Sequence, residues 1–225
     1  NEYYRRLLEL DQSGARSLAV RYCDEHGLEP TFNDVIAPTV GLMGEERSED
    51  HISQENEHFI VDTTREIIAE LGNRLSKPHV VPRLRILGVC APGEGHNLGL
   101  LMLLELLRQE GAAASFVGDN KSAEDIRGFA KRFTPDVVCL SCTVTECLPA
   151  AVELVQELKR DSPQLTVITG GEAAMAEPSK LLMAGCSQVC WSRSEARRLI
   201  RSYGLRRAKF RVVGATPSVV PRMKG

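Results

Sequence analysis

Residues 85–99, RILGVCAPGEGHNLG, decide the fold. The apolar run 86–90 predicts a buried strand, which breaks at an Ala-Pro-Gly sequence into a polar loop that carries Glu94 and His96. The residues that follow, LLMLLELLRQEG, predict a helix with a glycine at its end. A strand, a loop and a helix in this order place His96 at the carboxyl end of a strand, where open α/β sheets bind ligands.

Strands and helices alternate through the rest of this half of the chain, with short connections. This alternation predicts a doubly wound parallel sheet, a Rossmann-like or flavodoxin-like α/β fold. Two more buried strands end in polar or glycine residues, one in Ser141-Cys142-Thr143 and one in Gly170-Gly171. We expect strands at 85–90, 113–117, 137–141, 165–169 and 188–191, and helices at 98–109, 122–133, 145–160, 178–183 and 194–203.

The N-terminal part has the apolar period of helices instead. Apolar residues recur every three or four positions up to about Lys77, and Gly27 and a polar run at 44–50 interrupt them. About four helices with short connections predict a small bundle, with a kink at Pro38. The expected organisation is a helical cap at 1–77, a linker at 78–83, a sheet domain at 84–205 and a tail at 206–225.

Three motifs follow one another in the sheet domain: Glu-x-His-x-x-Gly, Ser-x-Thr and Gly-Gly. Between them lie 41 residues from Gly99 to Ser141 and 26 residues from Thr143 to Gly170. In motif order and spacing the chain resembles the cobalamin-binding domain of corrinoid enzymes and cobalamin-dependent photoreceptors. The usual motif has Asp two residues before the histidine, and Glu94 is a departure that the photoreceptor branch shares.

The resemblance implies a role for each motif residue. His96 would replace cobalamin's own base as the lower axial ligand of cobalt, and Glu94 would hold the other imidazole nitrogen. The displaced nucleotide tail would enter a slot in the sheet domain. Gly99 would keep the entrance of that slot open, hydroxyl groups would bind the tail, and paired glycines would leave room for it; these residues are Ser141, Thr143, Gly170 and Gly171.

The helical part resembles the cap of the light-responsive regulators. His58 matches a histidine that can bind cobalt after light removes the upper ligand, and Glu57 matches its acidic neighbour, with Met43 before them. In the family a tryptophan lies ten residues before this Glu, but here the position holds Arg47. The arginine predicts a looser upper pocket, in which its guanidinium binds a carboxylate or a corrin amide.

Composition limits the other function classes. A formal net charge of −2 and 43% hydrophobic residues fit a globular protein without a general attraction to nucleic acid. Neither a membrane span nor a signal peptide is evident, and seven scattered cysteines fit a reducing cytoplasm. Arginines crowd residues 193–211, which indicates a solvated basic face or, less often, a surface for an acidic partner.

Three functions remain open. The first is a cobalamin-dependent light sensor that acts on a protein partner or changes its own oligomeric state, without binding DNA or a membrane. The resemblance implies adenosylcobalamin or another alkyl- or hydroxocobalamin, and allows a bilin as a second chromophore. The second is a corrinoid shuttle subunit of a methyltransferase system, a branch that normally has Asp at the Glu94 position and lacks the Glu57-His58 pair. The third is a plain cobalamin carrier. No catalytic triad is evident, so we predict a protein that is not an enzyme.

Overall fold

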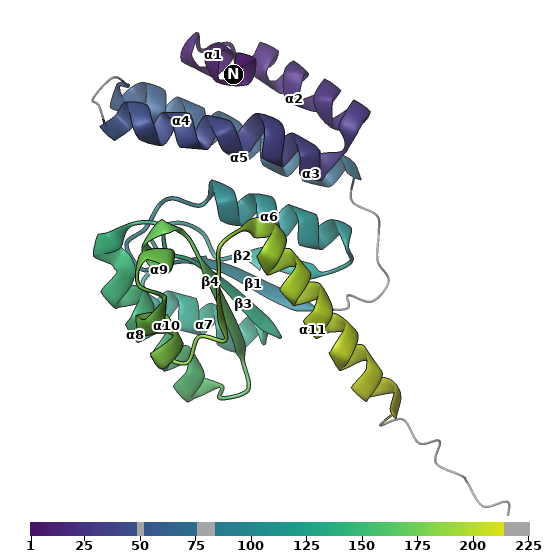
Figure 1. The fold of residues 1–225 in the computed structure, drawn as a ribbon, viewed down its shortest axis with the longest axis vertical. Coiled ribbons are helices and arrows are strands. Elements are labelled where there is room, and N and C mark those ends of the chain that lie inside the picture. The colour runs from purple at the N-terminus through teal and green to yellow at the C-terminus, as the bar shows by residue number, and fades with distance from the viewer. Residues whose placement is uncertain (49–51, 76–83, 214–225) are drawn as a thin grey trace, which may run out of the picture.

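A helical region lies on one face of a five-stranded sheet domain (Figure 1). The structure is a computed structural model that describes residues 1–48, 52–75 and 84–213, and the side chains of 1–43, 52–75 and 84–204. The expected linker at 78–83 lies outside these ranges. Within them, no helix combines the length and the apolar character needed to cross a membrane.

The predicted parallel sheet is confirmed. Its strands lie in the order β2-β1-β3-β4-β5, and every neighbouring pair is parallel. The order reverses between β1 and β3, and ligands bind at the carboxyl ends of strands at such a reversal. The strands are β1 Arg85–Cys90, β2 Ala113–Phe116, β3 Val137–Ser141, β4 Thr166–Gly170 and β5 Gln188–Cys190.

Helices cover both faces of the sheet, and each face has its own apolar core. The helices α6 and α11 pack on one face, and α7, α8 and α10 pack on the other. Their bounds are α6 Leu98–Gln109, α7 Ala123–Phe133, α8 Leu148–Asp161, α10 Pro178–Met183 and α11 Arg193–Val213, with the short elements η2 Thr145–Cys147 and α9 Glu172–Ala176.

The last helix differs from the prediction. It was expected to end at Tyr203, but α11 continues to Val213, so the boundary at 205 falls inside a helix. Gly204 is not a helix stop here. A Cβ at Gly204 would come within 3.1 Å of Leu84 Cδ1, so the glycine permits a close approach between α11 and the chain entering β1.

The helical region has the predicted bundle form. Its elements are α1 Glu2–Leu8, α2 Gln12–His26, α3 Leu28–Pro30, η1 Thr31–Ile36, α4 Ala37–Ser48 and α5 Gln54–Leu75. The segments α3, η1 and α4 follow one another without a break, and η1 is a π-helix. The irregularity expected at Pro38 therefore lies in the turn before it, where the Ala37 N–H donates to the Phe32 carbonyl.

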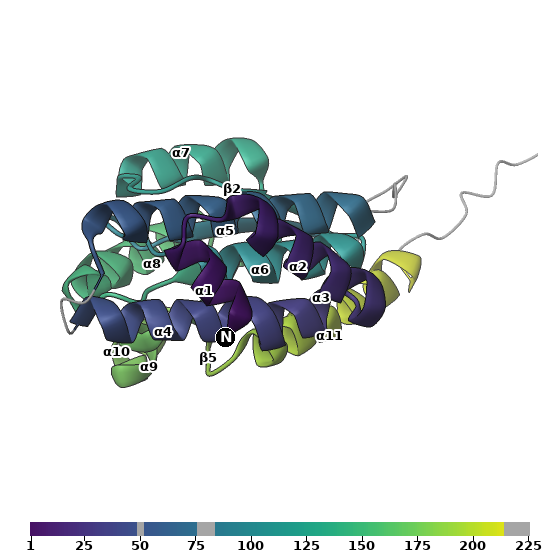
Figure 2. The ribbon, with the colours of Figure 1, turned by 90° about the horizontal axis from the view of Figure 1, so that it is seen from above.

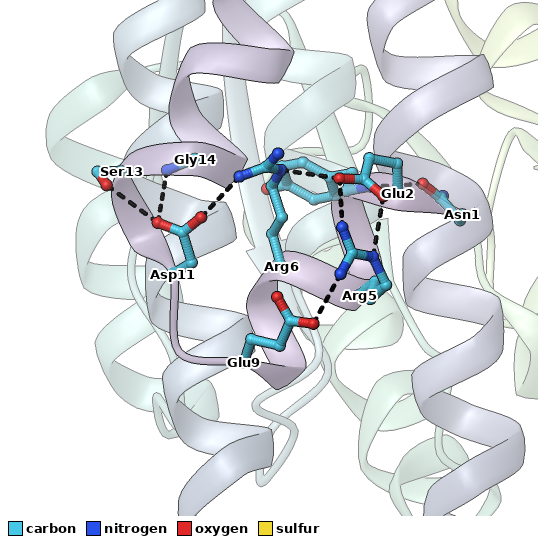
Figure 3. A network of polar contacts seen from close by, with 9 residues as sticks. Asn1, Glu2, Arg5, Arg6, Glu9, Asp11, Ser13 and Gly14 are labelled. Atoms are coloured by element: carbon cyan, nitrogen blue, oxygen red, sulfur yellow. Dashed lines mark hydrogen bonds and ion pairs between the residues drawn. The ribbon is translucent and has the colours of Figure 1, made fainter.

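Charged side chains form ion pairs across the turn between α1 and α2 (Figure 3). The Arg6 guanidinium donates to Glu2 at 3.0 Å and to Asp11 at 2.8 Å, and Asp11 caps α2 by accepting from the Gly14 N–H. The side chains in these pairs are 35–46% exposed, so water screens the charges and each pair contributes little to stability. The turn allows α1 and α2 to lie over α4 and α5, as the view in Figure 2 shows.

The helix α6 joins the two halves because it belongs to both cores. Its residues Leu98, Met102 and Leu106 are buried with the helical region, whereas Leu104 is buried against the sheet. Packing between α5 and α6 is close at Gly72. A Cβ there would lie 2.1 Å from the Glu105 carboxylate, so any larger residue would displace Glu105.

Two arginines of α11 also hold the helical region in place. Arg193 donates to the Phe32 carbonyl at 3.4 Å and to Asn33 Oδ1 at 2.8 Å, and Arg197 pairs with Glu29 and with Glu110. The expected solvated basic face is therefore wrong for these two side chains, which bind the helical region.

Candidate functional site

A cavity of about 760 Å³ lies between the helical region and the carboxyl edge of the sheet. Its wall includes residues that follow all five strands, as the reversal of strand order between β1 and β3 predicts. It brings together nine of the residues predicted for the site: Met43, Glu57, His58, His96, Gly99, Ser141, Thr143, Gly170 and Gly171.

His96 is exposed in the cavity wall, on the loop between β1 and α6. The loop has a defined conformation because the Glu94 N–H donates to the Ala91 carbonyl, and the Asn97 carbonyl, at the start of α6, accepts from the Leu101 N–H. The Asn97 side chain also donates to the Gly95 carbonyl at 3.2 Å. The backbone therefore holds His96 at the edge of the sheet while its imidazole stays accessible.

Glu94 lies behind the cavity wall with 1% of its surface exposed. Both carboxylate oxygens accept from the Thr143 N–H at 3.0 Å, which ties the loop after β1 to the loop after β3. Burial raises the pKa of the Glu94 carboxyl, and the Thr143 and Val144 hydrogen bonds oppose that rise. Its expected hydrogen bond to the His96 imidazole stays a prediction.

The three glycines of the motifs differ in the space that a side chain would have at each position. A Cβ at Gly99 would meet nothing within 4 Å, so this glycine leaves open space at the cavity. Gly170 is less open, because its Cβ would lie 3.5 Å from the Cys190 carbonyl oxygen. Gly171 has φ +111°, and a Cβ there would lie 2.3 Å from the Cys142 carbonyl oxygen. The expectation that Gly171 serves to leave room for a ligand is incomplete, because the backbone itself requires glycine.

We call the part of this cavity between the sheet and the helices α6 and α11 the slot. Its wall is mainly apolar: Leu100, Leu103, Cys139, Ile168, Cys190 and Ala196. Burial raises the pKa of the thiols of Cys139 and Cys190 to about 12. Both therefore stay protonated at neutral pH, and a protonated thiol is a poor metal ligand. Cys139 and Cys142 are both buried as free thiols among apolar side chains.

One face of α5 forms the opposite wall. Glu57, His58, Val61 and Arg65 recur at the three- and four-residue spacing of a single helix face, and all four line the cavity. His58 is exposed and Glu57 is half-buried. Met43 of α4 completes this wall. The side chain of Arg47 lies outside the described residues, so its expected place near the upper face stays a prediction.

Sequence reasoning missed a polar group at the side of the cavity. Asp119, on the loop after β2, accepts from Arg65 Nη2 at 2.9 Å and from the Asn97 side-chain amide. Trp191, at the end of β5, lies at the cavity with 68% of its surface exposed. Asp119 is 54 residues from Arg65 in sequence, and no local pattern predicts such a contact.

The residues present fit cobalamin. Among the described side chains, no group of three or more His, Cys, Asp and Glu is placed to hold a bare metal ion. A corrin supplies its own equatorial nitrogens, so the protein needs to supply only axial donors, and imidazole is a suitable one. His96 and His58 both line the cavity, and Gly99 leaves space beside the slot.

The chain is similar to known proteins in sequence and in fold. The HTH-type transcriptional repressor CarH of Myxococcus xanthus is 28% identical over 148 residues, which are 64% of this chain and 47% of the repressor. The chain thus spans about half the length of that curated relative. The monomethylamine corrinoid protein of Methanosarcina barkeri has the same fold, with a TM-score of 0.74 and 12% identity over 90% of this chain and 97% of that one.

The sheet domain itself matches a family model. The model of the B12 binding domain matches residues 84–198, which run from the residue before β1 into α11 and cover about half of the chain. They include the three motifs, of which these residues line the cavity: His96, Gly99, Ser141, Thr143, Gly170 and Gly171. The chain belongs to the B12 binding domain family, and its sheet domain is a cobalamin-binding domain.

Proposed function

We propose that this protein is a cobalamin-binding light sensor that signals through a protein partner or through its own oligomeric state. The observation that carries the proposal is the position of two accessible histidines. His96 lines the cavity from the sheet domain, and His58 lines the same cavity from the helical region. A carrier needs a single protein ligand, whereas a sensor that keeps a changed state needs a second group to hold that state.

Cobalamin, when bound, supplies a cobalt centre with two axial positions and, in its alkyl forms, a cobalt–carbon bond that light breaks. His96 would hold the cobalt from the side of the sheet domain, as the lower ligand, through its imidazole. Glu94 keeps the loop in place through its hydrogen bonds to the Thr143 N–H, and orients the imidazole directly or through water.

The slot accepts the displaced nucleotide tail. Ser141 and Thr143 line its entrance with hydroxyl groups, and Gly99 leaves the space through which the tail passes. The apolar residues deeper in the slot exclude water from the base at the end of the tail.

His58 would hold the cobalt from the side of the helical region, as the upper ligand, after light has removed the organic group. The exposed imidazole projects from α5, and Glu57 beside it also lines the cavity. A ligand bound at this position draws α5 toward the sheet domain, and the helical region is then the part of the molecule that a partner reads. The 28% identity to a transcriptional repressor supports a role in regulation.

Absorption spectra of the protein with methylcobalamin and with adenosylcobalamin test the proposal, in the dark and after illumination. The wild type is expected to give a stable bis-histidine light-state spectrum. His58→Ala is expected to give a water-ligated one, and His96→Ala to weaken binding or shift the dark spectrum. His26→Ala is the matched control, because His26 is an exposed histidine on α2. Identical light-state spectra for wild type and His58→Ala would contradict the assignment.

A corrinoid shuttle subunit of a methyltransferase system is the second candidate. It is favoured by the shared fold with the monomethylamine corrinoid protein, which covers nearly the whole of both chains. In that case, illumination leaves no state that depends on His58, and the reduced protein takes up and releases a methyl group in the dark. The same spectra therefore separate the two functions.

A further inference from the structure

Three polar side chains connect the helical region to the loop that carries His96. Arg65 of α5 donates through Nη2 to Asp119 at 2.9 Å, and Asn97 donates through Nδ2 to the other oxygen of the same carboxylate. Asp119 comes from the loop after β2. We call these three residues, Arg65, Asp119 and Asn97, the interdomain link.

The link is tied to the His96 loop at two further points. Asn97 follows His96 directly, and its side-chain amide also donates to the Gly95 carbonyl. The Asn120 N–H, next to Asp119, donates to the Glu94 carbonyl at 3.3 Å. A displacement of Asp119 therefore moves the backbone on both sides of His96.

The other end of the link lies on the helix that carries His58. Arg65 is seven residues after His58 on α5, which is about two helical turns along one face. Both side chains line the cavity. Since α5 is a continuous helix over Gln54–Leu75, a shift at His58 is transmitted to Arg65 as a movement of a rigid element.

Stability is a poor explanation for the link. Among the described residues, Arg65 Nε and Asn97 Oδ1 are buried side-chain atoms without a hydrogen-bond partner. Each such atom costs on the order of 1–3 kcal/mol. Arg193 and Arg197 already hold the helical region on the sheet domain at another place, through Asn33 and Glu29.

We propose that Asp119 is a positioning residue that couples the position of α5 to the presentation of His96. Its carboxylate accepts from Arg65 of the helical region and from Asn97 of the sheet domain. A displacement of either half therefore displaces Asp119, and through Asp119 the other half. The inference rests on the proposed function in one respect, because it takes His96 as the lower ligand. A change at His58 then alters the binding of His96, and by reciprocity a change at His96 alters the docking of α5.

Electron paramagnetic resonance of the protein loaded with cob(II)alamin measures the coupling directly. In protein labelled with ¹⁵N-histidine, a bound imidazole nitrogen splits the cobalt signal into doublets, so the histidine-bound fraction can be read. Asp119→Asn has the same shape, but an NH₂ donor replaces one of the two oxygens to which Arg65 and Asn97 donate, so one of these two donors faces another donor. We expect the equilibrium constant for histidine binding in this variant to be at least about fivefold below that of the wild type. A factor of about five is the lower end of the usual range for coupling between two sites.

Two further variants make the test specific. Asp62→Asn is the matched control, because Asp62 pairs with Arg65 at 3.2 Å but is 69% exposed and has no part in the link. It is expected to match the wild type. Arg65→Met removes the α5 end and leaves Asp119 with Asn97, and is expected to lower the histidine-bound fraction as Asp119→Asn does. This variant supplies the answer if Asp119→Asn does not fold.

The outcomes separate the inference from the function on which it rests. A wild type without ¹⁵N splitting would overturn the assignment of His96 and, with it, the coupling. A wild type with splitting and link variants that keep the same histidine-bound fraction would overturn the coupling alone. An equal loss in Asp62→Asn would also overturn it, because Arg65 would then act through its general charge environment.

Discussion

Gly99 is the residue at which the slot can be tested most cleanly. A Cβ there meets open space, whereas one at Gly171 meets a backbone carbonyl and would disturb the fold whether or not a ligand binds. Gly99→Leu is expected to block the entrance and to weaken cobalamin binding at least about tenfold, a loss of about 1.4 kcal/mol. Titration of hydroxocobalamin into each variant, followed by absorption, measures the effect.

Gly41→Leu is the matched control for this substitution. Gly41 is an exposed glycine of α4 whose Cβ would also meet nothing within 4 Å. Both substitutions put leucine into a helix, where it is more favourable than glycine by roughly 0.5–1 kcal/mol, so neither is expected to lower stability. Equal affinities for the two variants would place the tail elsewhere.

Glu105 makes stability depend on pH. It is 6% exposed on α6, and burial raises the pKa of its carboxyl above 4.5, although Arg108 opposes the rise. The folded protein then binds this proton more tightly than the unfolded chain does. The free energy of unfolding therefore falls as the pH rises from about 4.5 through the raised pKa, with no such effect below that window.

Glu105→Gln removes this titration and keeps the shape of the side chain. Urea denaturation of both proteins between about pH 4 and pH 7 is expected to show that the wild type loses stability relative to the variant as the pH rises. A wild type that gains stability relative to Glu105→Gln over that range would contradict the effect of burial.

The sequence predicted the elements of the sheet domain well because their signals are local. Strands β1 and β3 and helix α6 have the predicted bounds, since each is an apolar run or an apolar face between turn residues. The five-residue helix α9 was missed because it follows Gly171 without a recognisable start signal. The full length of α11 was missed, because the helix was expected to end at Tyr203 and it continues to Val213.

The helix α11 also connects the two halves of the molecule, which its own sequence does not indicate. Local charge pattern alone does not show that Arg197 lies with Glu29 and Glu110, residues far away in the chain. Arg197→Met is expected to lower the free energy of unfolding by about 1–3 kcal/mol, because it leaves carboxylates that are partly buried without this partner. Urea denaturation of the variant gives the value.

Arg198→Met is the control on the same helix. Arg198 is exposed, and surface substitutions of this kind usually change stability by less than about 0.5 kcal/mol. If both variants lose the same stability, the basic character of α11 matters rather than the contact that Arg197 makes between the halves.

At the scale of the whole molecule, the candidate site does not belong to either half. The motifs predicted the loops of the sheet domain that meet at the cavity, because the carboxyl ends of parallel strands share one edge. They did not predict Asp119 or Trp191, which only the folded chain brings to the cavity. The position of α5 over that edge follows from its packing on α6. A local sequence pattern predicts a helix but does not predict which other helix it packs against.

Because residues of both halves line the site, bound cobalamin is expected to slow hydrogen exchange in both halves. Binding to the folded state alone stabilises it by about 2.7 kcal/mol at a ligand concentration of 100 times Kd. Hydrogen exchange followed by mass spectrometry is expected to slow in the His96 loop and also in α5, which carries His58 on the opposite wall. The helix α7 lies on the far face of the sheet and serves as the internal reference. Slowing confined to the sheet domain would mean that cobalamin binds without α5, and His58 would then have no part in holding the upper position.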